Sequence, residues 1–215
     1  MNAREIIIIG CNGNCVDIAE AVEALAAHGG AVKVAGFLDD ADGMQGAEVA
    51  GYPVLGRIAD AAKFAGAGFV NGIGSPKSYR FKADIIARAG VPVERWATVI
   101  HPTAVVSRHA RIGRGTVLLA NVSVGAGARI GDHCMVLQNS VISHDSTIGD
   151  CSALATGVCV SGGCAIGENC YIGGNVSIRD GVRIAPGSLI GIGAVVVKDV
   201  AAVCVAFGNP ARPRA

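Results

Sequence analysis

The chain has 215 residues, of which 51% are hydrophobic and 16% are charged, and its formal net charge at pH 7 is +1. This near-neutral balance gives no electrostatic reason to expect nucleic acid or a membrane surface as a partner. The longest run of bulky apolar residues, positions 6–9, is far shorter than the roughly 20 residues that span a bilayer, and the first residues lack the pattern of a secretory signal. We therefore expect a soluble, cytoplasmic protein.

Residues 1–98 alternate between strand-like and helix-like patterns, which predicts a small parallel sheet with Rossmann-like winding. Strands are expected at 5–9, 32–38 and 69–73, with a further short element at 52–56. One helix is expected after the first strand, ending at 29–30, and another after the last strand, through 85–89. The segment 91–99 then leads into a region with a different pattern.

The turn after the first strand carries a possible phosphate site. Gly10-x-x-Gly13 lies between a strand and a helix, where backbone N–H groups and the helix dipole attract an anion. Asp39, at the end of the second strand, lies where an acidic residue accepts bonds from a ribose or a base. Asn12 and Cys15 occupy the later glycine positions of the dinucleotide fingerprint, which argues against an ordinary NAD site. The pattern alone fits a plain strand-to-helix turn equally well.

From residue 100 to residue 196, every sixth residue is Ile, Leu or Val. A period of six matches neither a helix nor a simple strand, and it is the signature of a hexapeptide β-helix. Three short strands would form each coil of about 18 residues, with coils stacked about 4.8 Å apart. Glycine often follows the aliphatic residue, as at Gly113 and Gly131, and we expect it to supply the backbone freedom of tight corners. This β-helix is expected to occupy residues 99–215. The aliphatic positions are Ile100, Val106, Ile112, Leu118, Val124, Ile130, Val136, Ile142, Ile148, Leu154, Val160, Ile166, Ile172, Ile178, Ile184, Ile190 and Val196.

The eight cysteines show neither a C-x-x-C pair nor a zinc-ribbon spacing. Cys134, Cys164 and Cys170 fall in the small-residue position two residues before an aliphatic residue, so we interpret them as compact apolar fillers. Without an export signal, no disulfide framework is expected.

His144-Asp145 is the strongest candidate for chemistry in the repeat region. The register places His144 at an outward corner, where a neutral imidazole can accept a proton and an adjacent carboxylate favours the imidazolium form. An ordinary solvated corner histidine has the same pattern. His109 lies 35 residues earlier, almost two coils or about 10 Å away, too far for a shared zinc ion. No metal is therefore expected.

Several motifs occur in one order across both regions. By these motifs and their order, the chain resembles the nucleotide-sugar acetyltransferases, which are hexapeptide-repeat proteins related to the sialic acid O-acetyltransferases. The resemblance implies a left-handed β-helix behind a small Rossmann-like domain. The motifs are Ile7-Ile8-Ile9-Gly10-x-x-Gly13, Gly36-Phe37-Leu38-Asp39-Asp40, Ile73-Gly74-Ser75, Ile100-His101-Pro102-Thr103-Ala104, Ser140-Val141-Ile142-Ser143-His144-Asp145 and Gly208-Asn209-Pro210-Ala211.

The resemblance also implies roles for individual residues. His144 would be the base of acetyl transfer from acetyl-CoA, supported by Asp145, in a homotrimer whose cofactor grooves lie between subunits. The implied oxyanion donor is the N–H of Gly162. The implied substrate-binding residues are Asn12, Gly13 and Asn14 near phosphate, Asp39 and Asp40 near base or ribose, and Gly74 and Ser75. The implied cofactor-binding residues are Ala153, Gly162 and Gly174.

The chain departs from its relatives at three places. Ala153 stands where relatives often have a second histidine, Asp145 stands where most carry glutamate, and Gly13-Asn14-Cys15 replaces a Gly-His-Gly turn. The expected activity is N-acetylation of a nucleotide-linked 4-amino sugar, with GDP-perosamine as the best single expectation. The alternatives are a sialic-acid-type sugar O-acetyltransferase and a non-catalytic trimer that binds a sugar nucleotide.

Overall fold

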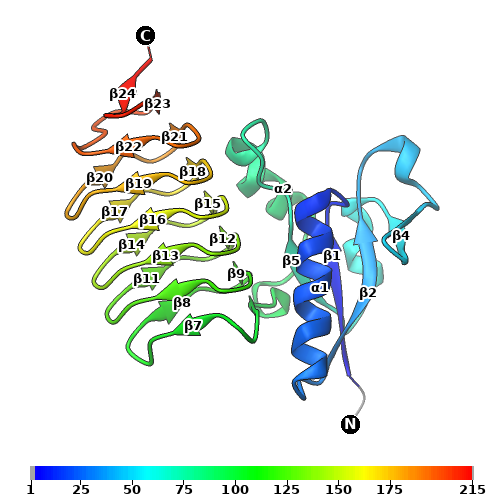
Figure 1. The fold of residues 1–215 in the computed structure, drawn as a ribbon. Helices are drawn as coiled ribbons and strands as arrows, with labels where there is room; N and C mark the ends of the chain where they lie inside the picture. The colour runs from blue at the N-terminus through cyan, green and yellow to red at the C-terminus, as the bar shows by residue number, and fades with distance from the viewer. Residues whose placement is uncertain (1–2, 215) are drawn as a thin grey trace.

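The computed structural model describes residues 3–214, which form an α/β domain beside a triangular β-helix (Figure 1). The sheet of the α/β domain has the order β3-β4-β2-β1-β5, parallel except for β3, which pairs with β4 in antiparallel fashion. Its helices and strands are β1 (Arg4–Ile9), α1 (Gly13–Ala27), β2 (Val32–Leu38), β3 (Glu48–Val49), β4 (Tyr52–Gly56), β5 (Gly68–Asn71) and α2 (Lys82–Arg88). Short 3-10 helices lie at Asp42–Met44, Ile58–Lys63, Tyr79–Phe81 and Val93–Arg95.

The central strand β1 explains why the predicted parallel sheet forms. The isoleucines at 6–9 are each at most 2% exposed, as expected for a strand covered on both faces. Helix α1 begins where the Asn12 side chain caps it by accepting the N–H of Asn14 at 3.0 Å. It ends at His28, before Gly29 at φ +90°. The predicted elements at 5–9, 32–38, 52–56 and 69–73 correspond to β1, β2, β4 and β5, whereas β3 and the 3-10 helices were not predicted.

Three sheets of short parallel strands form the β-helix. The first, here the covered sheet, faces the α/β domain and comprises β6 (Val99–Ile100), β9 (Val117–Leu118), β12 (Met135–Val136), β15 (Ala153–Leu154), β18 (Tyr171–Ile172), β21 (Leu189–Ile190), β23 (Val205–Phe207) and β24 (Arg212–Pro213). The second sheet comprises β7 (Val105–Val106), β10 (Ser123–Val124), β13 (Val141–Ile142), β16 (Cys159–Val160), β19 (Ser177–Ile178) and β22 (Val195–Val196). The third sheet comprises β8 (Arg111–Ile112), β11 (Arg129–Ile130), β14 (Thr147–Ile148), β17 (Ala165–Ile166) and β20 (Arg183–Ile184).

The register of these sheets confirms the predicted coil. Val117, Met135 and Ala153 pair in sequence along the covered sheet at steps of 18 residues. The aliphatic residues of the hexad point inward and are buried from Leu118 to Val196, while those of the first coil are only partly buried because nothing stacks beneath them. The hydrophobic period therefore sets both the fold and its core.

The cysteines in the small-residue position are buried, as predicted, but they also donate hydrogen bonds. The Cys134 thiol reaches the carbonyl of Gly149 at 3.2 Å, just as the Ser152 hydroxyl reaches the carbonyl of Gly167 at 2.9 Å. Cys164 and Cys170 make equivalent bonds to carbonyls 15 residues ahead, at 3.2 and 3.3 Å. A small donor at this position therefore ties each corner to the coil that follows, and all eight cysteines are free.

The expectation that glycines such as Gly113 supply backbone freedom at the corners was wrong. Gly113 and Gly131 do not have a left-handed backbone; a Cβ at Gly113 would lie 2.4 Å from the backbone of Gly131, one coil later. These glycines allow close stacking of coils. Left-handed φ angles instead recur every sixth residue from Gly115 to Gly193, at positions held by Gly, Asn, His133, Asp145 and Cys151.

The α/β domain packs against the covered sheet and shares a hydrophobic core with it. Ile18 and Val22 of α1 belong to the same buried cluster as Val117, Leu119 and Met135 of the β-helix. The chain passes between the two regions near Trp96, which bridges to Phe69, and β6 begins at Val99. Among residues 3–214, no helix combines the length and the apolar character needed to cross a membrane.

Candidate active site

His144 occupies the corner between β13 of the second sheet and β14 of the third sheet. Its Nδ1 lies 2.9 Å from Oδ2 of Asp145, and both side chains are well exposed. Asp145 adopts φ +58°, one of the recurring left-handed positions, and this backbone geometry turns its carboxylate back toward the preceding imidazole. The exposed corner therefore holds a paired imidazole and carboxylate.

Glycines in the neighbouring coils make room for this pair. A Cβ at Gly162, one coil after His144, would lie 2.6 Å from both Cε1 and Nε2 of the imidazole. A Cβ at Gly127, one coil before Asp145, would lie 2.4 Å from its Oδ1. Both substitutions would displace a side chain of the pair, so the two glycines define the positions of the imidazole and the carboxylate.

This geometry fixes which ring nitrogen is free. When Nδ1–H donates to the Asp145 carboxylate, Nε2 carries the lone pair and can accept a proton from a bound nucleophile. Gly162 packs against the imidazole of His144, and its backbone N–H makes no hydrogen bond with residues 3–214. A base and a free N–H donor in neighbouring coils are the two groups that acyl transfer requires.

The predicted substrate residues gather at the carboxyl edge of the parallel sheet. Asn12 to Asn14 begin α1 directly after β1, and Asp39 follows β2, the neighbouring strand. The N–H of Gly10 donates to the carbonyl of Leu38 at 2.7 Å, which holds these two strand ends together. Gly10 needs its φ of +95°, and a Cβ there would lie 2.7 Å from Ile73, after β5. The structure thus brings residues 12–14, Asp39 and the 74–75 turn to one edge.

The Asp40 carboxylate has different partners from the Asp39 carboxylate. One of its carboxylate oxygens accepts the N–H of Ile58 at 3.0 Å, and the other pairs with Arg88 of α2. This carboxylate is therefore occupied in holding the domain together. A role for Asp40 at a base or ribose stays a prediction.

The backbone carbonyl of Ser75 accepts the N–H groups of Ser78 and Tyr79, and the Ser75 hydroxyl lies 2.9 Å from that of Ser78.

Within one chain, the two predicted halves of the site do not meet. The α/β domain lies on the covered sheet (Figure 1). His144 lies between β13 and β14, at the corner opposite that sheet. The two halves do share a level along the β-helix axis, because Gln138 of the His144 coil donates to Asp17 near the start of α1 at 3.1 Å. A single chain therefore presents the candidate nucleotide-binding edge and the candidate catalytic corner at one height, on opposite sides.

The three predicted cofactor residues lie in three places. Gly162 adjoins His144, whereas Gly174 lies on the corner between the covered sheet and the second sheet. Ala153 is 1% exposed and lies between the domains, where a Cβ at Gly74 would come within 3.5 Å of its methyl group. The structure thus places Ala153 beside the 74–75 turn rather than beside His144. The cofactor roles of Ala153 and Gly174 stay predictions.

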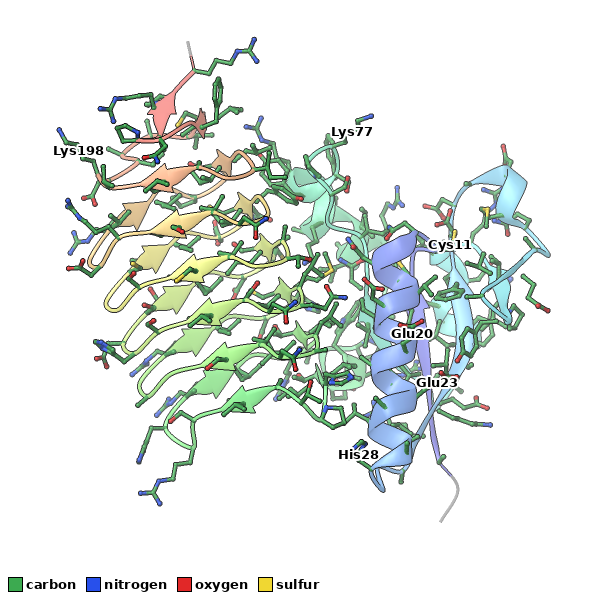
Figure 2. The ribbon with its side chains drawn as sticks, in the orientation of Figure 1. Cys11, Glu20, Glu23, His28, Lys77 and Lys198 are labelled. Carbon is green, nitrogen blue, oxygen red and sulfur yellow. The ribbon has the colours of Figure 1, made fainter. Side chains whose placement is uncertain are left out.

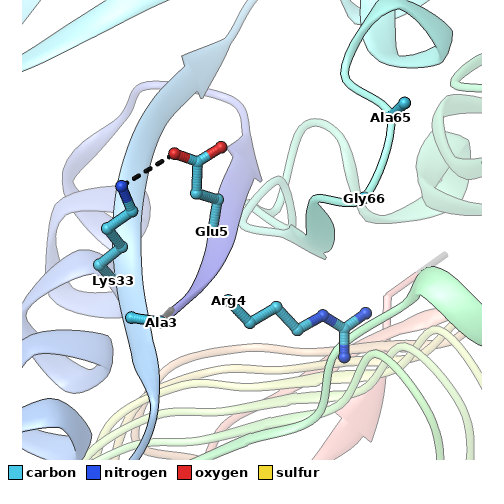
Figure 3. Close-up of a pocket in the computed structure, with 6 residues that line it drawn as sticks. All are labelled: Ala3, Arg4, Glu5, Lys33, Ala65 and Gly66. Carbon is cyan, nitrogen blue, oxygen red and sulfur yellow. Dashed lines mark ion pairs between the residues drawn. The ribbon is translucent and has the colours of Figure 1, made fainter. Parts of the chain in front are cut away.

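Of two surface cavities, one lies away from the candidate site and the other lies next to the coil of His144. The larger, about 720 Å³, lies at the amino edge of the sheet, away from both candidate regions, and is lined by Arg4, Glu5 and Lys33, with the last two ion-paired at 2.9 Å (Figure 3). The second, about 580 Å³, is a groove on the third sheet that includes Thr147, three residues after His144. Nowhere in residues 3–214 do three or more His, Cys, Asp or Glu side chains gather as metal ligands.

Two groups near the candidate site were missed from the sequence. The Cys11 thiol donates to Asp39 at 3.1 Å, which no spacing rule predicts because the partners come from separate strands. Lys82 is completely buried, and its Nζ has no hydrogen-bond partner among residues 3–214. Burial lowers the pKa of Lys82. Its place at the start of α2, between the charged residues Arg80 and Asp84, predicted an exposed side chain.

Comparison with known proteins places this architecture in a class. No family model matches the chain, and no curated protein sequence matches it. Among solved structures, the acetyltransferase domain of PglB from Neisseria gonorrhoeae FA1090 is 30% identical, with a TM-score of 0.87 over 98% of this chain and 100% of that domain. PerB from Caulobacter crescentus, solved with CoA and GDP-perosamine, is 28% identical, with a TM-score of 0.83 over 98% of this chain and 97% of that one.

A third structure agrees with these two. WeeI from Acinetobacter baumannii AYE is 26% identical, with a TM-score of 0.84 over 99% of this chain and 100% of that one. The β-helix is thus of the left-handed, hexapeptide-repeat class found in acyltransferases. The chain belongs to the hexapeptide-repeat sugar acetyltransferases, which confirms the resemblance drawn from its motifs and makes the protein an enzyme.

Proposed function

We propose that this enzyme transfers the acetyl group of acetyl-CoA to the 4-amino group of a nucleotide-linked amino-deoxy sugar, with GDP-perosamine as the substrate. The observation that carries the proposal is the corner where Nδ1 of His144 is held by Asp145 and Nε2 lies against Gly162. The related structures add support, since one is the PglB domain in complex with acetyl coenzyme A and another is PerB with CoA and GDP-perosamine.

In this mechanism the sugar amine attacks the thioester carbonyl directly. A C–N bond forms, the carbonyl oxygen becomes an oxyanion beside the N–H of Gly162, and Nε2 of His144 takes a proton from the nitrogen. Collapse of this intermediate breaks the C–S bond, and the imidazolium returns the proton to the departing sulfur. Asp145 stabilises the imidazolium between these two steps.

The proposal includes a homotrimer whose active sites lie between chains. The substrate-binding edge and His144 lie on opposite sides of one β-helix but at one level. Chains arranged around an axis parallel to the β-helix would bring the edge of one chain to the corner of the next. An acyl donor between two β-helices could then contact Gly162 of one chain and Gly174 of another.

A substrate panel tests the reaction. GDP- and UDP-linked 4-amino sugars and their hydroxyl counterparts would each be offered with acetyl-CoA, and release of free thiol would be followed. We expect release with amino sugars and the highest kcat/KM with GDP-perosamine. Release only with hydroxyl sugars would favour an O-acetyltransferase, and binding without any release would favour a non-catalytic protein.

Substitution of the base is the second test. His144→Ala should lower kcat by about 10²- to 10⁴-fold, the usual contribution of a general base. His109→Ala is the matched control, because His109 is also an exposed corner histidine, but within residues 3–214 its ring bonds only Arg108 and no carboxylate. An unchanged rate for His144→Ala would refute the catalytic role. A residual rate is expected for an amine, which needs a base less than a hydroxyl does.

Mixing two variants of low activity, one without the base and one with weakened substrate binding, tests the shared site. His144→Ala chains would be unfolded and refolded together with Asp39→Asn chains. If each site takes a corner from one chain and an edge from another, mixed oligomers contain intact sites and activity returns. If each chain acts alone, the mixture keeps the low activity of its components.

A further inference from the structure

Asp39 is the carboxylate left free of cations at the carboxyl edge of the sheet. Its neighbour Asp40 is taken by Arg88 and by the N–H of Ile58. Among residues 3–214, no lysine or arginine forms an ion pair with Asp39, which is half-buried at the end of β2. A half-buried carboxylate without a cation must be stabilised by hydrogen-bond donors.

Two donors from the protein hold this carboxylate. The Cys11 thiol donates to Oδ2 at 3.1 Å, and the N–H of Ala41 donates to Oδ1 at 2.9 Å. The Gln45 amide donates to the backbone carbonyl of Asp39 at 2.7 Å, which holds the backbone of Asp39 in place. Each carboxylate oxygen therefore has one protein donor and one acceptor position to spare.

The Cys11 thiol is suited to this task because it stays protonated. Burial, together with the hydrogen bond to Asp39 and the negative charge of Asp39, raises the pKa of Cys11 to about 12. The thiol is thus a donor throughout the neutral range. Cys11 lies at the end of α1 remote from His28, where the turn after β1 meets the end of β2 (Figure 2).

We infer that Cys11 is a positioning residue for the nucleoside of the sugar nucleotide, holding the Asp39 carboxylate so that its two oxygens accept a pair of neighbouring donors. This inference rests on the proposed function. A carboxylate repels a diphosphate, so the phosphates lie toward the N-terminus of α1 and the uncharged nucleoside lies toward Asp39. Two groups offer such a donor pair: the ribose diol and the N–H edge of guanine.

A double-mutant cycle tests the role of Cys11. Steady-state rates would be measured at saturating acetyl-CoA with the best sugar nucleotide of the panel. Cys11→Ala should raise KM by about 5- to 10-fold, because the thiol is a weak donor to a charged acceptor, and should leave kcat within about 2-fold. Cys11→Ser should restore KM, because a hydroxyl is also a donor.

The coupling with Asp39 separates positioning from a merely structural role. In an Asp39→Asn background, Cys11→Ala should change KM by less than about 2-fold, because the carboxylate that it positions is gone. Equal effects in both backgrounds, or an unchanged KM in Cys11→Ala, would overturn the inference. Cys11→Val is a second variant without a donor should the alanine variant fail to fold, and Cys159→Ala, an exposed cysteine of the second sheet, is the control.

Nucleotide analogues identify the donor pair. Calorimetric affinities of GDP, 2′-deoxy-GDP and inosine diphosphate would be compared between the wild type and Asp39→Asn. Loss of affinity on removal of the 2′-hydroxyl, seen only in the wild type, assigns the ribose. Loss on removal of the exocyclic amine assigns guanine. No difference for either analogue would refute the inference, whereas absence of acetyl transfer by the wild type would refute the proposed function itself.

Discussion

In the β-helix, the surroundings of a residue follow from its position in an 18-residue period, whereas in the α/β domain they depend on segments far apart in the sequence. His144 meets Gly162 because the two are one coil apart. Cys11 meets Asp39 only because β1 and β2 are adjacent in a sheet whose order is not the order of the chain. The periodic half thus presents the candidate catalytic corner on a regular scaffold, and the non-periodic half gathers the candidate binding edge from several loops.

The largest effect expected from this difference is on stability. Leu154→Ala empties a fully buried position of the β-helix and should cost about 2 to 5 kcal/mol, as should Ile8→Ala in the sheet. Because each coil contacts only its neighbours, hydrogen exchange should show lost protection mainly in the coils that flank Leu154. Ile8→Ala should instead reduce protection throughout the sheet. Equal spread in both variants would show that the β-helix is as cooperative as the domain.

Buried thiols give the next largest effect, through pH. Burial raises the pKa of Cys15 in the α/β domain and of Cys134 in the β-helix to about 12, from 9.0. The folded chain therefore keeps protons that the unfolded chain loses above pH 9, and stability falls as pH rises from about 9 toward 12. Between pH 9 and 10.5 the loss should be about 2 kcal/mol per thiol.

Denaturant melts of single variants assign this loss to each region. Cys134→Ser keeps a small donor in the position that Ser152 holds one coil later, and should flatten the alkaline decline of the β-helix. Cys15→Ala should do the same for the sheet. A decline of the same slope in both variants and the wild type would show that the thiols do not cause it.

A smaller effect, on kcat, is expected from a substitution at the candidate catalytic corner. Gly162→Ala places a Cβ 2.6 Å from the His144 ring and should displace it, lowering kcat by about 10- to 100-fold with little change in melting temperature. Gly43→Ala is the control, because a Cβ there meets nothing within 4 Å. A normal kcat for Gly162→Ala would show that the observed stacking of His144 on Gly162 is not needed for catalysis.

The smallest effect concerns the joint between the two regions. Lys82→Met removes a buried amine without a partner and should stabilise the protein by about 1 kcal/mol or more at pH 7. Because burial lowers the pKa of Lys82 below its usual 10.5, the folded chain releases this proton before the unfolded chain does. The stability of the wild type should therefore gain from this group as pH rises toward 10.5, and Lys82→Met should remove that gain. Thermal melts at two pH values measure both.

These differences also decide how much could be predicted from the sequence. The hexad alone predicted the coil, the buried aliphatic residues, the cysteines at the small position and the outward corner of His144. It did not predict that Gly113 is needed for stacking rather than for a turn, because a pattern of glycines does not distinguish these two needs. The strands around Asp39 were predicted as well, since their apolar runs are local signals.

What could not be predicted depends on contacts between distant segments. The pairing of Asp40 with Arg88 joins β2 to α2, and Ala153 is buried only because the 74–75 turn packs over it. Nothing in the local sequence of either partner marks these contacts. The sequence therefore predicts the surroundings of individual residues less well in the α/β domain than in the β-helix.

The 18-residue register has a consequence for how such a chain can change in length. One further coil inserted after residue 188 would extend the β-helix by about 4.8 Å and leave every inward position apolar. It would not alter the level of His144 relative to α1, because their contacts lie in earlier coils. An insertion whose length is not a multiple of six would shift the hexad and bring outward residues such as Lys198 into inward positions. An insertion of six or twelve residues would keep the hexad but move the following strands to a different sheet. Growth of the β-helix beyond the His144 corner thus keeps both the hexad and the order of the sheets only in whole coils.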